Sequence, residues 1–239
     1  PEGEPIPAEG VVVTDVSGNG NDLVRVDLPN ASPEAMIWAD ASAANMPGDG
    51  SIRIFGNNDT QIGAYLRTVE DAMLNDFTFE DGYTVEAFIL LPEDWSGEVN
   101  RWTGILSRQG TGGDAGKTES DLNEAIGHLA VSNFPEFQWA VWPTNLESIQ
   151  TNWSDQLALG EWYHVAIINE DGSTIMYVNG EQVLRNPSET SFGIDTAGLP
   201  WTIGGTHYAN EPNSFHGWIG DIRVVARPIG FDEFLTAGN

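Results

Sequence analysis

The stretch Glu161–Asn186, EWYHVAIINEDGSTIMYVNGEQVLRN, decides the fold of this chain. It opens with Trp162–Asn169, a run of the aromatic and β-branched residues that strands favour. Asp171-Gly172 follows, a pair suited to tight hairpin turns because it tolerates positive φ. Thr174–Val178 continues as a second strand, and Asn179-Gly180 turns the chain into a short third one. We therefore expect three consecutive antiparallel strands.

Short strands recur along the rest of the chain. In Tyr83–Leu91 the residues Tyr83, Val85, Ala87 and Ile89 alternate onto one face, as a strand requires. Further strands are expected at Leu23–Leu28, Ser51–Phe55, Ala64–Arg67, Gly104–Ser107, Gly127–Val131, Glu136–Trp142, Trp201–Gly204 and Trp218–Val225. Helical periodicity is weak, with candidates only at Ser32–Trp38 and Phe231–Ala237. About twelve to fourteen short strands predict an all-β, antiparallel two-sheet β-sandwich.

The length of 239 residues suits one well-buried domain. Pro1–Gly10 is polar, with three Pro and three Glu, and is interpreted as a linker before a single domain over residues 11–239. The chain starts without Met, which suggests a piece of a larger protein or a processed one. The absence of Cys excludes a disulfide scaffold but not export. No apolar run reaches the roughly 18 residues that a membrane span needs, so membrane insertion is not expected.

The chain is strongly acidic, with 36 acidic and 9 basic residues and a formal net charge of -27. Such a surface repels nucleic acid and anionic membranes, because phosphate binding needs clustered Lys and Arg. Three explanations stay open. The charge serves solubility in a salty or extracellular setting, it binds Ca²⁺, or it attracts a cationic partner.

Four blocks, in order, resemble laminin-G-like domains of the concanavalin-A-like lectin superfamily. They are the entry loop Asp15–Asn21, the segment Phe77–Trp95 with its TVEAFILLPEDW ending, the hairpin above, and Phe215–Arg227, FHGWIGDIRVVAR. Three features depart from the family pattern. Gly220 stands where the family often has an acidic residue, and Arg227-Pro-Ile-Gly replaces the common ending. The glycine-rich, acidic loop Gln109–Asn123 is longer than usual.

The resemblance implies a concanavalin-A-like jelly roll. The family consists mostly of binding modules, and similar domains are attached to secreted bacterial phosphoesterases, glycosidases and adhesins. It therefore implies a bacterial exported or cell-surface protein, with other domains of the parent protein as partners. Fold does not fix the ligand.

Catalysis is not expected. Retaining glycosidases hold two carboxylates about 5–5.5 Å apart, and sandwich glucanases place them in a strand pattern such as E-x-D-x-x-E. That pattern occurs at Glu119–Glu124, but polar residues separate its carboxylates and it falls in a loop, which cannot hold a fixed spacing. Gly110–Thr118 has five residues between its glycines where a phosphate-binding loop has four. No G-x-S-x-G or H-E-x-x-H motif is present.

A structural Ca²⁺ is predicted at the loop Asp15–Asp22. Its oxygen donors include Asp15, Asn19 and Asn21, and Ca²⁺ takes six to eight oxygens. The resemblance places the first and last strands close together, which would bring Asp221 to the same site. The alternative is that Gly-Asn-Gly-Asn is simply a turn.

Sugar binding needs aromatic platforms and planar polar side chains. In the run at 137–142, alternation puts Phe137, Trp139 and Val141 on one face and Gln138, Ala140 and Trp142 on the other. We expect Gln138 and Trp142 to line a concave sheet beside Glu86 and Arg108. His207 and Tyr208, on a loop, form a second candidate. For Trp102, Trp162 and Trp201, packing in the core is the main expectation.

The sequence thus predicts a non-catalytic module that binds a carbohydrate or another surface ligand. Two rivals remain: a structural or adhesive module that packs on an attached enzyme, and a divergent polysaccharide hydrolase or lyase of the same fold.

Overall fold

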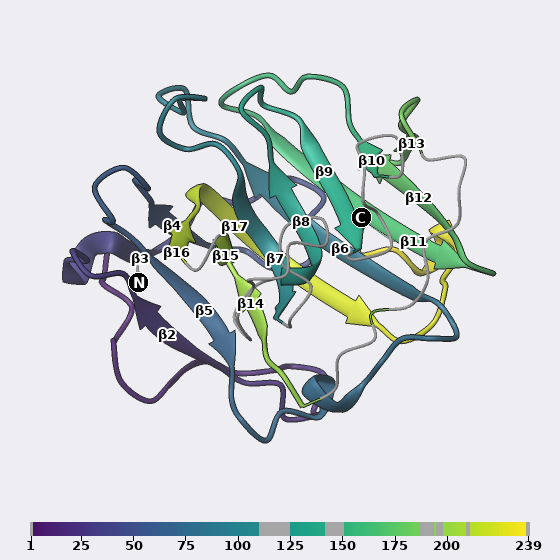
Figure 1. Ribbon diagram of the computed structural model, residues 1–239, viewed down its shortest axis with the longest axis horizontal. Coiled ribbons are helices and arrows are strands. Elements are labelled where there is room, and N and C mark those ends of the chain that lie inside the picture. Colours follow the sequence, from purple (N-terminus) through teal and green to yellow (C-terminus); the bar gives the residue numbers. More distant parts are fainter. Residues whose placement is uncertain are drawn as a thin grey trace.

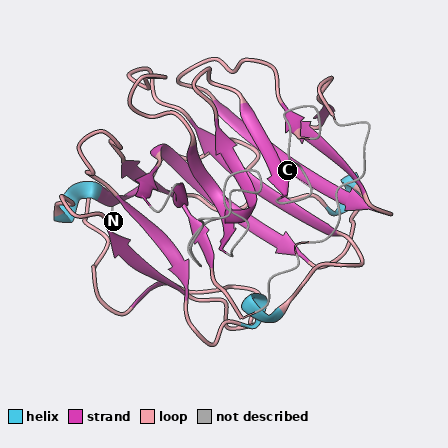
Figure 2. Ribbon diagram, in the orientation of Figure 1, coloured by secondary structure: helices cyan, strands magenta, loops and turns pink. Residues whose placement is uncertain are grey.

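The computed structural model describes residues 2–109, 125–141, 151–186, 194, 198–208 and 211–237. The molecule is built from antiparallel strands in two stacked sheets (Figures 1 and 2). Its helical residues are three single 3₁₀ turns within these ranges, η1 (Pro33–Ala35), η2 (Met73–Asp76) and η4 (Phe231–Glu233). The predicted all-β, two-sheet sandwich is confirmed. In the described ranges, no helix has the length and apolar character that crossing a membrane requires.

The first sheet has eight strands. In spatial order they are β1 (Val11–Val13), β2 (Leu23–Asp27), β5 (Ala64–Thr68), β14 (Trp201–Ile203), β7 (Thr103–Gln109), β8 (Ala125–Val131), β9 (Phe137–Val141) and β10 (Asn152–Trp153).

The second sheet has seven strands. In spatial order they are β13 (Glu181–Gln182), β12 (Ser173–Val178), β11 (Trp162–Glu170), β6 (Tyr83–Leu90), β17 (His216–Val225), β4 (Ser51–Phe55) and β3 (Met36–Ala39). A separate hairpin joins β15 (Gly205–Tyr208) to β16 (Glu211–Ser214).

The hairpin from β11 to β13 forms as predicted. At its first turn Asp171 and Gly172 have φ of 51° and 76°, and at its second Asn179 and Gly180 have φ of 51° and 80°. Two successive residues with positive φ make the turn whose twist matches that of the flanking strands, and Asp, Asn and Gly tolerate this conformation best.

The core lies between the two sheets. Val85, Ala87 and Ile89 of β6 alternate inward and are fully buried, and they face Leu129 and Trp139 from the other sheet. The Trp139 indole donates a hydrogen bond to the Tyr83 hydroxyl at 3.0 Å, which ties β9 to β6 across the core.

The N-terminal segment corrects one expectation. Residues 3–6 do not form a linker: Gly3 and Ile6 donate backbone hydrogen bonds to β3, and Ile6 is buried in the core. β3 is an edge strand with backbone groups left unpaired by β4, and this segment covers them. The helical candidate at Ser32–Trp38 forms only the single turn η1, because pairing with β4 extends the chain from Met36 onward. At Phe231–Ala237 the structure keeps a single 3₁₀ turn, η4.

Candidate functional site

Two Trp side chains share one row across the outer face of the seven-stranded sheet. Trp162 pairs with Leu90, Leu90 with Trp218, and Trp218 with Arg53. Directly paired residues point to the same face, so all four point away from the core. We call these four residues the outer-face row. Trp162, Leu90 and Trp218 are half-buried and keep accessible surface. Two strand spacings separate the two Trp residues, about 9.6 Å at roughly 4.8 Å per strand.

Cation–π contacts hold one end of this row. The Arg53 guanidinium carbon lies 4.2 Å from the Trp218 ring centroid and 4.3 Å from that of Phe55. The guanidinium is therefore stacked by two rings, and it also donates to the Ile54 carbonyl at 2.6 Å. A buried cation between two aromatic faces fixes both rings in orientation.

A polar cluster borders the row. His216 Nε2 lies 3.2 Å from Arg53 and 3.2 Å from an Asp94 carboxylate oxygen. These contacts are alternatives, because one ring nitrogen either accepts a hydrogen bond from Arg53 or donates one to Asp94. The Asp94 side chain is 76% exposed, so most of its carboxylate remains accessible to solvent.

The charges of this cluster follow from burial. Burial lowers the pKa of Arg53 to about 10, so the guanidinium stays charged at neutral pH. Burial and the neighbouring Arg53 lower the pKa of His216, so its imidazole is neutral at neutral pH. The hydrogen bond from His216 lowers the pKa of Asp94, which stays ionised. At neutral pH the cluster thus presents one cation, one anion and one neutral imidazole.

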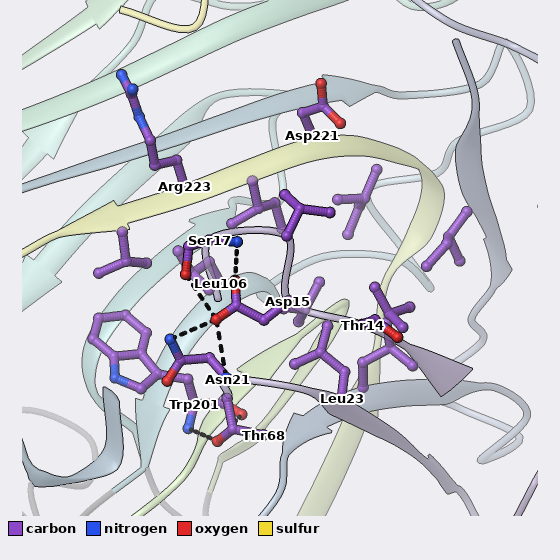
Figure 3. A pocket seen from close by; sticks show the side chains of 18 of the residues that line it. Thr14, Asp15, Ser17, Asn21, Leu23, Thr68, Leu106, Trp201, Asp221 and Arg223 are labelled. Atoms are coloured by element: carbon purple, nitrogen blue, oxygen red, sulfur yellow. Dashed lines mark hydrogen bonds between the residues drawn. The ribbon is translucent and has the colours of Figure 1, made fainter. Parts of the chain in front are cut away.

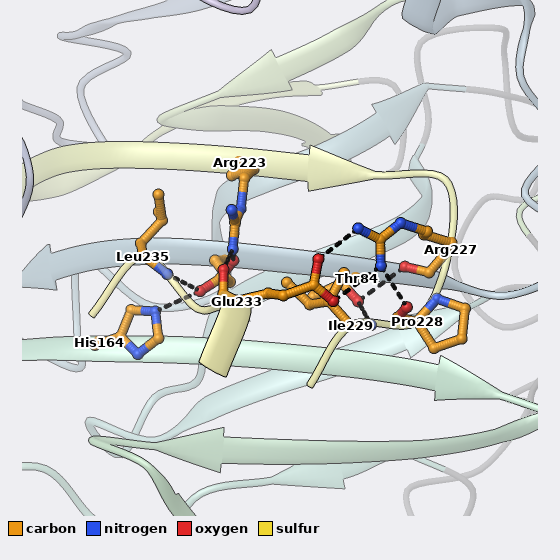
Figure 4. Close-up of polar contacts among 9 residues, drawn as sticks. Thr84, His164, Arg223, Arg227, Pro228, Ile229, Glu233 and Leu235 are labelled. Atoms are coloured by element: carbon orange, nitrogen blue, oxygen red, sulfur yellow. Dashed lines mark hydrogen bonds and ion pairs between the residues drawn. The ribbon is translucent and has the colours of Figure 1, made fainter. Parts of the chain in front are cut away.

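The C-terminal segment, residues 228–237, covers the other half of the same face (Figure 4). Glu86 lies beneath it and is fully buried. Its carboxylate accepts from His164 Nε2 at 3.0 Å, from Arg223 Nε at 2.8 Å and from the Leu235 backbone N–H at 2.8 Å. The predicted ligand-binding role of Glu86 is corrected, because its carboxylate is occupied by these contacts and lies out of reach of a ligand.

The Arg108 side chain, in the eight-stranded sheet, is likewise occupied by hydrogen bonds within the protein. It is fully buried on β7, and its guanidinium donates to the carbonyls of Leu74 and Asn75 at 2.8 and 2.5 Å. Since Glu86 and Arg108 belong to different sheets, they do not line one concave face as expected. Glu86 and Arg108 are separated by the way the strands pair into two sheets. Alternation along a single strand carries no information about that pairing.

The remaining predicted sugar-binding residues do not gather into one site. Gln138 is half-buried on β9, with Ala130 and Trp153 as its cross-strand partners. His207 is half-buried in β15, and its ring meets the Tyr65 ring edge-on at 6.4 Å. Tyr208 ends β15 opposite Glu211. The predicted Trp142 and the Glu119–Glu124 motif lie outside the described residues.

The predicted calcium loop is closed by its own hydrogen bonds (Figure 3). The Asp15 carboxylate accepts from the Ser17 N–H and hydroxyl at 2.8 Å each, and from the Asn21 N–H and amide at 3.0 Å each. Burial alone would raise the pKa of Asp15, but these bonds outweigh it and keep the pKa below its usual value. The Asn21 side-chain oxygen accepts from the Leu74 N–H at 2.8 Å.

Asp221 is turned away from this loop. Its carboxylate accepts from the Gly48 N–H at 2.6 Å, and Figure 3 shows it on the opposite side of β17 from Asp15. The described residues contain no group of three His, Cys, Asp or Glu side chains able to hold a metal. The donor set therefore does not fit a Ca²⁺ held jointly by Asp15 and Asp221, because each carboxylate is bonded to partners of its own.

Sequence reasoning missed Trp218, Arg53 and His216 as site residues. The sequence did contain a pattern that could have indicated them. His216 and Trp218 alternate with inward-facing residues in one strand, and Arg53 and Phe55 alternate with inward-facing residues in another. Only the pairing of β17 with β4 brings the two patterns together.

The fold is shared with domains of known structure. Domain 4 of AbnA, an extracellular arabinanase from Geobacillus stearothermophilus solved with arabinotriose, is 15% identical, with a TM-score of 0.56 over 91% of this chain and 88% of that one. The botulinum neurotoxin serotype G binding domain is 11% identical, with a TM-score of 0.56 over 92% of this chain and 46% of that one.

Trypanosoma rangeli sialidase is 13% identical, with a TM-score of 0.51 over 83% of this chain and 27% of that one. At these identities the likeness shows the fold alone.

Comparison with curated proteins gave no match. A family model described as the concanavalin A-like lectin/glucanases superfamily, of the laminin-G type, matches residues 58–233. This range contains the hairpin and most of both sheets, and it confirms the resemblance drawn from the sequence. Because the match spans well over half of the sequence, the chain belongs to the concanavalin A-like lectin/glucanase superfamily.

Proposed function

We propose that the protein is a non-catalytic carbohydrate-binding module of an exported multidomain protein, and that the outer-face row is its binding surface. One observation carries this proposal: Trp162 and Trp218 lie on one face, both partly exposed, two strands apart. A sugar ring has an apolar face of C–H groups that stacks on an indole. Two Trp positions two strand spacings apart, about 9.6 Å along the sheet, suit an oligosaccharide that stacks a ring on each indole.

The polar groups beside the row supply the second half of sugar recognition. Asp94 accepts hydrogen bonds from hydroxyl groups, and the neutral His216 either accepts or donates. Arg53 holds Trp218 and bonds to His216, so it positions the site. The arabinotriose bound to a domain of the same fold supports the ligand class, although fold alone does not fix function.

Binding is favoured over catalysis on this face. Glu86 lies on β6, the middle strand of the seven-stranded sheet, and it is fully buried and held by His164 and Arg223. A glycosidase needs two carboxylates that reach the substrate.

A glycan array followed by calorimetry with the oligosaccharides that bind would test the proposal. We expect Trp162→Ala and Trp218→Ala each to weaken binding about tenfold or more, which corresponds to about 1.4 kcal/mol for a lost stacking contact. Trp102→Ala is the matched control: Trp102 is 41% exposed but lies outside the row, stacked edge-on against Trp153.

Other outcomes would favour the rival functions. If no glycan binds and the neighbouring domain protects Trp162 and Trp218 from solvent, the domain is a packing module. If the pure protein degrades a polysaccharide, the non-catalytic assignment is overturned.

A further inference from the structure

A large cavity opens between the two sheets, away from the outer-face row. It has a volume of about 1180 Å³ and lies among β1, β2, β5 and β14 on one side and β3, β4 and β17 on the other. Its walls are mainly aliphatic, and Figure 3 shows Leu23 and Leu106 among them. A pocket of this size and apolar character can hold a whole small molecule.

The mouth of this cavity also carries exposed apolar side chains. Val16 is fully exposed, Met73 is 50% exposed and Phe77 is 42% exposed, and all three line the cavity. Single exposed apolar residues are ordinary, but several around the opening of an apolar cavity mark a ligand entrance. An aliphatic ligand would bury them.

The charged groups at the rim are of one sign. Asp15, Asp40 and Asp49 line the cavity, and the last two are exposed. Arg223 also borders it, but its guanidinium lies on the other face of β17, bonded to Glu86. The formal net charge of -27 adds a long-range field that attracts cations. An anionic ligand such as a free fatty acid is therefore disfavoured at this mouth.

One buried donor on the cavity wall has no hydrogen-bond partner in the part of the chain that the structure describes. The Trp201 indole N–H is buried and makes no hydrogen bond among the described residues, although the backbone N–H of Trp201 donates to Thr68 at 3.0 Å. A buried donor left unpaired costs about 1–3 kcal/mol, so a ligand that brings an acceptor to it gains affinity.

We infer that this cavity is a second binding site, which takes an amphipathic cation: an aliphatic acyl chain joined through an ester to a quaternary ammonium head. The chain would fill the aliphatic cavity, the ammonium would lie among the rim aspartates, and the ester oxygen would accept from Trp201. This inference is independent of the proposed carbohydrate site, because the two use opposite faces of β17.

Calorimetry with lauroylcholine, below its micelle concentration, would test the site. Dodecanoate serves as the probe with the opposite head charge, and dodecyltrimethylammonium as the probe without an ester. We expect lauroylcholine to bind at least about tenfold more tightly than dodecanoate. Its binding should shift the indole N–H resonance of Trp201, assigned by its loss in Trp201→Phe.

Two variants locate the binding. Ile52→Trp places a larger side chain on the cavity wall and should abolish binding, and Asp40→Asn with Asp49→Asn should reduce it about tenfold. If Ile52→Trp fails to fold, the charge variant, which changes only exposed side chains, still tests the site. Trp162→Ala is the control and should leave lauroylcholine binding unchanged.

Three results would overturn the inference: equal affinity for dodecanoate, unchanged binding in the charge variant, or a Trp201 resonance that does not move. Loss of lauroylcholine binding in Trp162→Ala would also overturn it, because the ligand would then occupy the outer face.

Discussion

We predict that the buried Glu86 carboxylate stabilises the packing of the C-terminal segment, residues 228–237, on the seven-stranded sheet. The variant Glu86→Gln removes the charge and leaves the shape. The wild-type carboxylate accepts from Arg223, His164 and the Leu235 N–H, while the amide oxygen of Gln can satisfy only part of this set.

The expected cost is about 2 kcal/mol at neutral pH. A hydrogen bond to a charged group contributes about 1.5–3 kcal/mol, and breaking a fully buried ion pair costs about 3–5 kcal/mol. Arg223 is 32% exposed, so water replaces part of what it loses, which lowers the estimate. In a chain of this length about 2 kcal/mol lowers Tm by about 4–8 °C.

The effect should depend on pH with a definite sign. Burial alone raises the pKa of Glu86, but hydrogen bonds from His164, Leu235 and Arg223 outweigh it and hold the pKa below the ordinary 4.5. A folded-state pKa below the unfolded value adds stability above pH 4.5, and this stability is lost as the pH falls through the folded value. The difference between wild type and Glu86→Gln should therefore be full at neutral pH and shrink in acid.

Guanidinium unfolding followed by Trp fluorescence, at neutral pH and at about pH 3, would measure both effects. Glu233→Gln is the matched control: it breaks the Arg227–Glu233 pair of the same segment, whose side chains are about half exposed, and should change nothing measurable. If Glu86→Gln is no less stable than Glu233→Gln at neutral pH, the reasoning about this carboxylate is refuted.

Three further outcomes are expected from unfolding experiments. Tyr83→Phe leaves the Trp139 indole N–H unpaired and should cost about 1–2 kcal/mol; a loss under about 0.5 kcal/mol would contradict the bond between the sheets. Gly204→Ala should cost more than Gly180→Ala. Both have positive φ, but a Cβ at Gly204 would lie 2.2 Å from Ile54, whereas one at Gly180 meets nothing within 4 Å; equal costs would contradict the crowding. Millimolar Ca²⁺ should leave Tm unchanged, because Asp15 and Asp221 each have separate hydrogen-bond partners; a rise in Tm that a chelator reverses would contradict this geometry.

Local sequence patterns determined many of the strands of this protein and the two turns of its hairpin. Alternation in Tyr83–Leu91 predicts which side chains enter the core, and Val85, Ala87 and Ile89 are indeed fully buried. Asp171-Gly172 and Asn179-Gly180 predict the turns that form. These predictions hold because strand alternation and positive φ depend on neighbours in the chain.

The site could not be predicted in the same way. Glu86 was expected on an open face, yet a segment about 150 residues later in the chain covers it, with Leu235 donating to its carboxylate. Trp162 was expected in the core, and Tyr163 faces it instead, next to Phe137 from the other sheet. A slip of one residue reverses the faces of a strand, so alternation alone does not say which face is inside.

What the sequence by itself determined is therefore the fold class, the hairpin and the family, because each rests on short-range patterns of residue type. The tertiary structure alone decided which residues can meet a ligand. It placed Trp162 and Trp218 in one row, occupied Glu86 and Arg108 with internal partners, and opened a cavity beside Asp15. Accessibility and juxtaposition depend on how distant strands pair and on what covers each face, and no local pattern contains that information.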